Sequence, residues 1–403
     1  MHDAVVIGAG VIGVTTAHAL SRAGASVLLV DSAEKPGLGA SFANGAQLSY
    51  AYTDALASPM LLRKLPTLAL GLDPLFRLKP GFDPGLYSWL LFFLRNMTAA
   101  RFKRNTLDVL ELALASQAEM QALLERHRLD FYHAVPGKMH LYYSKKALRA
   151  ATTIMALKQR HGADQQVLDA KAAVAIEPAL ANAEGLAGVI YSPSDAVGDA
   201  QRFCEGLMAI CQDQLGVTIR LGRTVAQLER VGDAWNVATT TGEMFNARRL
   251  IVCAGARSRA IARHVGLALP IQPMKGYSFT AKPGPAAPRV SVTDTSRKIV
   301  FCRLGSKMRV AGLAELGNSS PALELARASL LRALATEALP GAIDDGDVGS
   351  EWAGLRPMTP SSRPIVRWVD PTLALNTGHG MLGWTLALGS AARLAGAMPA
   401  LSS

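Results

Sequence analysis

The sequence predicts a mixed α/β fold, with an α/β domain built on a parallel sheet and an interleaved α+β domain built on an antiparallel sheet. Three observations predict it. The 403 residues exceed the ~100–200 typical of one domain. Half of them are hydrophobic and 18% are charged, which excludes disordered and collagenous classes. A glycine-rich turn joins a strand to a helix near the start, and strand and helix patterns return after residue 198.

The first element is a strand over residues 3–7, followed by the turn Gly8-Ala9-Gly10-Val11-Ile12-Gly13 and a helix over 14–23. A second strand over 25–30 ends at Asp31. The glycines permit a tight turn, close approach of a pyrophosphate and close helix packing, while the acid accepts ribose hydroxyls. The pattern predicts a bound dinucleotide, and an acid at this position argues against NADP. The expected contacts are Val6, Gly8, Gly10, Val11, Ile12, Gly13, Asp31 and Ser32.

The segment from 37 to 47 is small, polar and flexible. Such a stretch can pass along the phosphates and ring of a flavin, whereas NAD dehydrogenases usually continue into another βαβ unit. FAD is therefore the expected cofactor. The contacts predicted here are Ser41, Asn44, Gly45, Ala46 and Gln47.

Two motifs lie near the other end of the chain. Arg356 stands within 352–360 among residues that restrict the backbone, so its guanidinium offers a fixed, two-pronged donor for a carboxylate. A loop from 376 to 385 then leads into a helix over 386–398, whose N-terminus could face the negative N1–C2=O edge of a reduced flavin. Its expected contacts are Gly378, Gly380, Met381, Leu382, Gly383, Trp384 and Thr385.

The cofactor domain is predicted to be discontinuous, comprising 1–55, 196–266 and 351–403. Its middle part holds a helix over 201–215, a strand over 217–221 and an apolar run over 250–255 that brings Ala254 and Gly255 to the cofactor. Residues 130–195 and 267–350 are expected to form the antiparallel substrate domain that covers the flavin.

Residues 56–129 are predicted to be a helical, basic and apolar segment. Between residues 61 and 105 eight Lys and Arg face two Asp, more than half of the net charge of +11. The apolar run over 86–94 is shorter than the ~20 residues that span a bilayer. It is expected to dock on a membrane surface, to contact another subunit, or to pack as a helix pair on the substrate domain. No recognised nucleic-acid module accompanies the positive charge, so no nucleic-acid partner is expected.

Other chemistries are not supported. The four cysteines form no disulfide framework or CxxC pair, and a reducing cytoplasm fits them. The histidines lack metal-ligand spacing, so no metal is expected, and no GxSxG elbow is present.

Several motifs in order give the chain a resemblance to the flavin-dependent D-amino acid dehydrogenase (small-subunit) family, within the D-amino acid oxidase-like group that includes glycine and sarcosine oxidases. The resemblance spans nearly the whole chain. It rests on residues 8–13, 41–44, 86–96, 177–180, 198–199, 273–278, 354–360 and 377–385.

By this resemblance Arg356 anchors the substrate α-carboxylate, His379 lies against the isoalloxazine, and Tyr277 and Tyr52 form the polar wall of the substrate pocket. Val225 is implied to meet the adenine. Lys275 is either near the flavin, a residue that holds its loop, or a solvated strand-end lysine. The implied reaction passes a hydride from Cα of a D-amino acid to flavin N5, and the electrons go on to a quinone or another carrier.

The chain departs from the family pattern at three places. Asn44-Gly45-Ala46 replaces Asn-Ala-Gly, residues 195–199 read Asp-Ala-Val-Gly-Asp, and Ser361-Ser362 replaces Asp-Gly. All three surround the expected pocket. The alternatives therefore remain a D-proline or cis-4-hydroxy-D-proline dehydrogenase, a glycine- or sarcosine-oxidising enzyme, and a non-catalytic flavin-binding regulator. The expected location is the cytoplasm, with or without association with the inner membrane.

Overall fold

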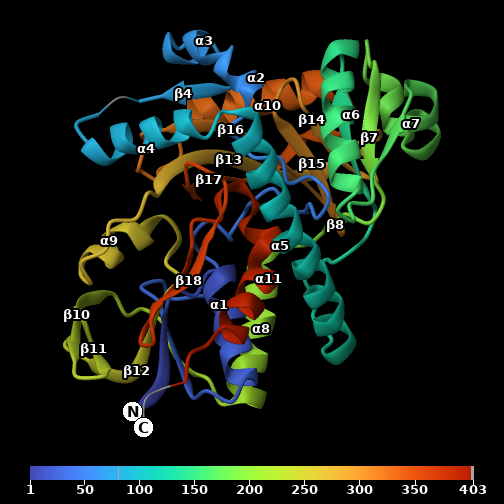
Figure 1. The fold of residues 1–403 in the computed structure, drawn as a ribbon. Coiled ribbons are helices and arrows are strands. Elements are labelled where there is room, and N and C mark those ends of the chain that lie inside the picture. Colours follow the sequence, from blue (N-terminus) through green and yellow to red (C-terminus); the bar gives the residue numbers. More distant parts are fainter. Residues whose placement is uncertain (80, 401–403) are drawn as a thin grey trace.

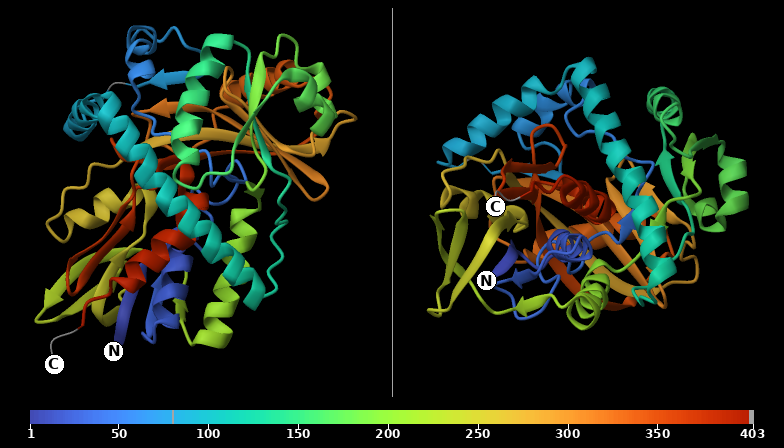
Figure 2. Two further views of the ribbon diagram at one scale, coloured as in Figure 1. Left: turned by 45° about the vertical axis from the view of Figure 1, so that its right-hand side comes forward. Right: turned by 60° about the horizontal axis from the view of Figure 1, so that its bottom comes forward.

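A computed structural model describes residues 1–79 and 81–400 of the chain. Two large sheets dominate it, and in Figure 1 one lies above the other. We call them the lower sheet and the roof sheet. Segments far apart in sequence contribute to each, so the chain crosses between them repeatedly, as the two further views in Figure 2 also show.

The lower sheet has a parallel centre in the order β9-β2-β1-β12-β19. The meander of β10 and β11 pairs with the first half of β12, and β18 pairs antiparallel with β19. Its strands are β1 (His2–Ile7), β2 (Val27–Val30), β9 (Thr218–Arg220), β10 (Val225–Val231), β11 (Ala234–Thr239), β12 (Met244–Val252), β18 (Ile365–Asp370) and β19 (Leu373–Thr377).

Three helices cover one face of the lower sheet: α1 (Val11–Arg22), α8 (Ala200–Leu215) and α11 (Gly383–Gly396). Their apolar sides form a single buried cluster with the sheet. The long helix α5 (Ala99–Arg126) packs on α11. The opposite face packs against α9 (Ser258–Arg263) in a second cluster. Burial of these apolar stripes is what holds the layers together.

The roof sheet runs in the order β17-β13-β16-β15-β14-β5-β7-β6, with β4 added to β16. The predicted sheet was purely antiparallel; the observed one is mixed, because β14 with β5 and β16 with β4 are parallel pairs. Its strands are β4 (Phe76–Leu78), β5 (Lys138–Tyr142), β6 (Gln166–Leu168), β7 (Gly188–Ser192), β13 (Gln272–Pro283), β14 (Ser291–Asp294), β15 (Ile299–Leu304), β16 (Lys307–Leu316) and β17 (Ile343–Met358).

Two predicted boundaries need correction. The border at residue 350 falls inside β17, which pairs with β13 from Pro283↔Ile343 to Gln272↔Met358, so the strand carries Arg356 into the roof sheet. The 56–129 segment is not wholly helical, since β4 extends the roof sheet. Its helices are α2 (Pro59–Leu62), α3 (Leu65–Ala69), α4 (Pro84–Arg95) and α5.

The two faces of the roof sheet differ. The outer face packs on α10 (Leu325–Ala338), with Tyr277 and Phe279 in that cluster. The inner face meets the 41–47 loop, because the Ser278 hydroxyl donates to Ala43 O and Arg309 donates to Asn44 O at 3.1 Å. The remaining elements are β3 (Gln47–Leu48), β8 (Ala196–Val197), α6 (Lys145–Gln159), α7 (Ala170–Ile176) and the 3-10 helices η1 (Pro178–Asn182), η2 (Gly255–Arg257) and η3 (Gly380–Leu382).

Candidate active site

The glycine-rich turn lies at the carboxyl end of β1 and leads into α1. A Cβ on Gly13 would lie 1.6 Å from Gly8 O, and Gly8 itself has φ +109° with Cys253 O 2.7 Å from its Cβ position. Both positions therefore require glycine. At Gly10 the only atom of the described residues within 4 Å of a Cβ position is Ser41 Oγ, at 3.6 Å. That open side leaves room for a phosphate.

The first turn of α1 offers positive potential at this opening. Gly10 caps the helix without a side-chain hydrogen bond, and the Val11 N–H donates to Ser41 Oγ at 3.1 Å. No acidic residue occupies the first turn. An uncapped helix N-terminus beside a glycine cradle is suited to an anionic pyrophosphate.

The carboxyl ends of neighbouring strands bring the other predicted contacts to the same edge. Asp31 follows β2, where its carboxylate accepts the N–H groups of Ala9 and Ala33. Ser32 accepts a hydrogen bond from Arg257 at 2.9 Å, Val225 begins β10, and Ala254 and Gly255 follow β12 beside the turn. Val6 lies in β1 itself.

The loop from Ser41 to Gln47 passes beneath the inner face of the roof sheet. A Cβ on Gly45 would meet Val300 at 3.1 Å, and the Gln47 amide donates to Ser291 and Thr293. Ala46 has φ +59°, with its N–H held by Asn44 Oδ1 at 2.9 Å. The left-handed conformation thus falls on the third position, where the family has glycine and this chain has alanine.

The second glycine-rich loop follows β19 and leads through η3 into α11. Gly378 and Gly380 have φ of +76° and +59°. Gly383, at the start of α11, has no side-chain cap before it, and Trp384 and Thr385 are buried in the first turn, while Met381 is exposed. This helix N-terminus therefore also has free N–H groups that can face a negative flavin edge.

His379 is buried in that loop with 2% of its surface exposed, and neither ring nitrogen has a hydrogen-bond partner among the described residues. Burial lowers the pKa of His379 to about 3, so the imidazole is neutral at pH 7. Such orphaned polar atoms are expected where a polar ligand completes the site. The glycine cradle, the two uncapped helices and His379 together fit FAD.

Arg356 lies on the inner face of the roof sheet. Its guanidinium covers Gly276, where a Cβ would lie 2.2 Å from Nη2, and Nη1 donates to Leu313 O at 3.2 Å. Within the described residues no carboxylate forms an ion pair with it. Burial lowers the pKa of Arg356 to about 10, which still leaves it charged at pH 7. A partly buried guanidinium without an ion pair is a ready partner for a ligand carboxylate.

The structure does not bring Tyr277 together with Arg356. Side chains alternate along β13, so Gly276 and Ser278 face inward while Tyr277 faces α10. Its hydroxyl donates to Glu315 at 3.1 Å. Lys275 shares that outer face, is 1% exposed, and donates to Ala322 O, so it holds a loop and is not a solvated lysine.

Tyr52 lies on the inner side, within a group of buried polar residues that the sequence did not reveal. Its ring stacks on His140 with centroids 3.7 Å apart, and the ammonium groups of Lys138 and Lys158 lie 5.4 and 5.2 Å from its ring centre. No motif marks these residues, because Lys138 and His140 lie on β5 and Lys158 on α6, and only tertiary packing brings them to Tyr52.

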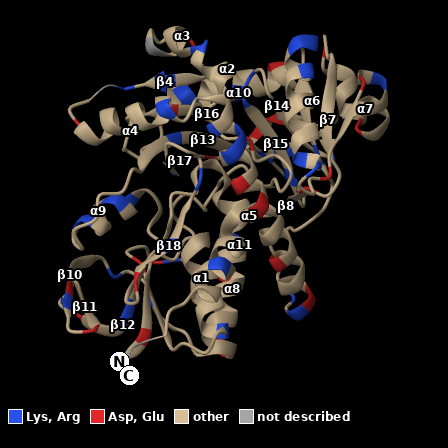
Figure 3. Cartoon of the chain, viewed as in Figure 1, with Lys and Arg blue, Asp and Glu red and all other residues tan. Residues whose placement is uncertain are grey.

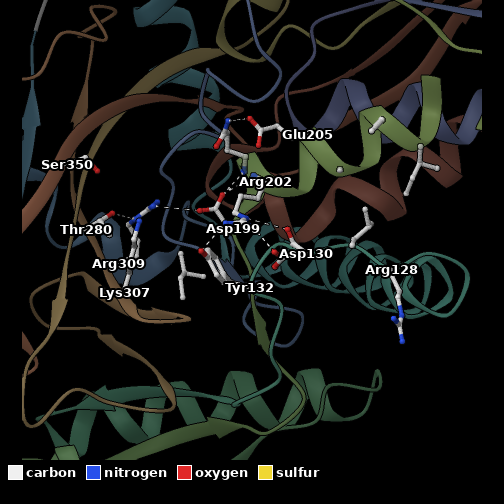
Figure 4. A pocket seen from close by; sticks show the side chains of 16 residues that line it. Arg128, Asp130, Tyr132, Asp199, Arg202, Glu205, Thr280, Lys307, Arg309 and Ser350 are labelled. Carbon is white, nitrogen blue, oxygen red and sulfur yellow. Dashed lines mark hydrogen bonds and ion pairs between the residues drawn. The ribbon is translucent and has the colours of Figure 1, made fainter. Parts of the chain in front are cut away.

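A separate cavity of about 750 Å³ opens beside α8, and none of the predicted site residues lines it. Figure 4 shows Arg309 at its inner wall, hydrogen-bonded to Thr280 and 3.9 Å from Asp199, with Arg202 between Asp130 and Tyr132. Its charged groups are mostly paired with one another.

Comparison with known proteins agrees with this geometry. Residues 3–397 match the family described as FAD dependent oxidoreductase, and the chain belongs to that family. It is 38% identical to "D-amino acid dehydrogenase 2" of Ralstonia nicotianae, over 97% of this chain and 95% of that protein. The protein of the same name from Pseudomonas aeruginosa is also 38% identical, over 97% and 93% of the two chains.

Solved structures share the fold at low identity. Glycine oxidase from Geobacillus kaustophilus gives a TM-score of 0.76 at 20% identity, covering 99% of this chain and 95% of that one. L-proline dehydrogenase from P. horikoshii also gives 0.76, at 15% identity and 98% and 92% coverage. The protein is thus an FAD-dependent oxidoreductase with a mixed α/β fold, as the sequence predicted.

Proposed function

We propose that this protein is a D-amino acid dehydrogenase that oxidises its substrate at Cα. The observation that carries the proposal is Arg356, a partly buried guanidinium on the inner face of the roof sheet with no ion pair among the described residues. The full-length similarity to proteins named D-amino acid dehydrogenase supports the same substrate class.

In this mechanism Arg356 binds the substrate carboxylate through two parallel hydrogen bonds and so orients Cα. Packing over Gly276 and the bond to Leu313 O restrict the guanidinium, which lowers the entropic cost of binding. Bound FAD supplies the acceptor for the hydride. His379 contributes a neutral, buried imidazole and no charge at pH 7. The released imine is hydrolysed by water to a 2-oxo acid and ammonia, or stays cyclic for a D-proline-like substrate.

Anaerobic mixing of the purified yellow protein with D- and L-amino acids, D-proline, cis-4-hydroxy-D-proline, glycine and sarcosine tests the proposal. Loss of flavin absorbance with D-forms alone is the expected result, and the most rapid substrate distinguishes linear from cyclic acids. Bleaching by sarcosine or glycine alone, or by none of the compounds with FAD bound, would overturn it.

Arg356→Ala and Arg356→Lys variants test the residue itself. We expect kcat/KM to fall by about 10³-fold or more in the alanine variant, since a buried bidentate contact is lost. Arg363→Met is the matched control, because Arg363 is seven residues away and pairs with Asp108 at the surface. Equal kcat/KM in Arg356→Ala and the control would refute the assignment.

We further propose that electrons leave for a quinone or similar carrier at the cytoplasmic face of a membrane, with α4 as the docking element. Its inner side packs Leu86, Trp89 and Phe93, but its outer side exposes apolar residues. Figure 3 shows α4 as largely uncharged. The exposed apolar residues there and close by are Met60, Leu62, Leu70, Leu72, Phe82, Tyr87, Leu91, Phe92 and Leu94.

Cations flank this apolar surface, which matches an anionic lipid layer. Arg95 lies over the Phe92 ring at 5.6 Å, and Arg101, in the first turn of α5, donates to Arg95 O at 2.8 Å. None of the helices in residues 1–79 and 81–400 combines the length and apolar character needed to cross a bilayer.

Vesicle sedimentation tests this docking. We expect the protein to sediment with vesicles rich in phosphatidylglycerol, less with phosphatidylcholine, and Leu91→Ser with Phe92→Ser to abolish the difference. Val231→Ser with Met244→Ser is the control, because it removes exposed apolar residues from the β10–β12 region. The proposal would be contradicted if the α4 variant still bound the vesicles as the wild-type protein does while the Val231→Ser, Met244→Ser control variant lost binding.

A further inference from the structure

Lys138 is an unusual residue at the inner face of the roof sheet. It is the first residue of β5 and only 3% exposed. Its neighbours Met139 and Leu141 face outward into the α10 cluster, so the lysine side chain points inward. Its Nζ donates to Ser49 Oγ at 2.6 Å.

This ammonium has no direct ion pair among the described residues. The nearby Lys158 differs, because its Nζ lies 2.7 Å from Asp54 and also donates to Ala51 O. Asp195 acts on Lys138 through space, but its own carboxylate is engaged by the Ala51 N–H at 3.0 Å. Burial lowers the pKa of Lys138 to about 8, and most of it is charged at pH 7.

Ser49 connects Lys138 to the cofactor site. The Ser49 N–H donates to Thr385 Oγ1 at 2.9 Å, and Thr385 lies in the uncapped first turn of α11. Gln47, two residues before Ser49, ends the loop that passes beneath the roof sheet. Lys138 therefore lies directly behind the two segments that fit the flavin, and its charge adds to the potential of the α11 N-terminus.

We propose that Lys138 supplies a fixed positive charge that stabilises the reduced, anionic form of the bound FAD and thereby raises its reduction potential. A buried charge in a medium of low dielectric acts over several ångströms with little screening. The effect requires the charge and not the hydrogen bond to Ser49. A purely structural role, as a counter-charge for Asp195, would leave the potential unchanged.

The test is the two-electron midpoint potential of the FAD-loaded protein at pH 7, measured anaerobically against reference dyes, without substrate. Lys138→Gln keeps a donor for Ser49 but loses the charge, and Lys138→Met loses both. We expect the equilibrium constant for flavin reduction to fall at least about tenfold in both, or about 30 mV for two electrons. Ser49→Ala and the exposed Lys146→Gln should remain near the wild-type value.

Lys138→Arg provides a further test in case the other Lys138 variants do not retain FAD, because it keeps the positive charge and its potential should remain near the wild-type value. An unchanged potential in Lys138→Gln and Lys138→Met, a fall in the potential of Lys138→Met but not of Lys138→Gln, or a fall of at least about 30 mV in Lys138→Arg would each overturn the proposal. Because no amino acid is used, failure of the proposed substrate would not affect this result.

Discussion

At the scale of single residues, the motifs predicted the strand, glycine turn and helix at residues 2–22 and the acid after β2, because these features reflect backbone geometry that is local in sequence. The side of the roof sheet on which the Tyr277 side chain lies could not be predicted in the same way. It depends on which side of β13 meets α10, and β13 carries an irregularity in its pairing with β16 between Lys275 and Tyr277. The group of Lys138, His140, Lys158 and Tyr52 depends on tertiary packing of a strand, a helix and a loop that are distant in sequence.

Replacing Gly13 by Ala should abolish FAD binding. The added Cβ would lie 1.6 Å from backbone oxygen of Gly8, which cannot move without breaking the turn. Gly396→Ala is the control, since no atom of residues 1–79 and 81–400 lies within 4 Å of its Cβ position. The ratio of flavin to protein absorbance after purification measures the effect, and a yellow Gly13→Ala protein with normal stoichiometry would contradict it.

Ser362 explains one departure from the family pattern. It adopts φ +64°, where glycine is usual, and its hydroxyl accepts the Leu56 N–H at 2.9 Å. Ser362→Ala keeps the strained backbone and loses the bond, so it should cost about 1 kcal/mol of unfolding free energy. Ser362→Gly loses the bond but relieves the strain and should cost less. Denaturant unfolding of both variants checks this order, and the reverse order would refute it.

At the scale of elements, the main helices and strands of the lower sheet follow from the apolar patterns. The short strand β4 does not, because three residues pair only with a distant neighbour and carry no periodicity. The border placed at residue 350 missed that β17 continues as one strand, since its exposed half is acidic and glycine-rich and resembles a loop.

Helix α4 is tied to the cofactor domain by one carboxylate. Asp83 caps the helix and receives two hydrogen bonds from Arg259, at 2.6 and 2.8 Å, and one from Gln272. These donors hold the pKa of Asp83 well below its usual range. Asp83→Asn should therefore lower the unfolding free energy by about 1–3 kcal/mol. Faster proteolysis near α4 would accompany it, while Asp233→Asn, on the β10–β11 turn, should change neither.

At the scale of the whole molecule, buried histidines make the fold sensitive to acid. Burial lowers the pKa of His18 to about 4 and that of His379 to about 3, from 6.5. The unfolded chain then binds more protons, so stability falls as pH drops below 6.5. At pH 5 the loss is about 2 kcal/mol for each histidine. The pKa of Asp195 is raised to about 6 in the folded protein, so this residue adds stability as the pH falls and offsets part of the loss from the histidines.

Scanning calorimetry of the FAD-loaded protein should therefore show the melting temperature rising from pH 5 to pH 7. His18→Gln should flatten that rise, because the glutamine has no proton to gain on unfolding. His161→Gln, an exposed histidine, is the matched control. A melting temperature that is level or falling over this range would contradict the argument.

The position of β17 at the border of the roof sheet has a consequence for solubility. One side of the strand pairs with β13, and its outer half presents Asp344, Asp345 and Asp347, with Gly346 between the last two. When two molecules approach edge to edge, repulsion between these carboxylates opposes pairing of β17 with β17 of the other molecule. Such pairing would otherwise distort the strand that carries Arg356. The acidic residues that made this part of β17 resemble a loop in the sequence therefore also oppose edge-to-edge association of molecules into fibrils.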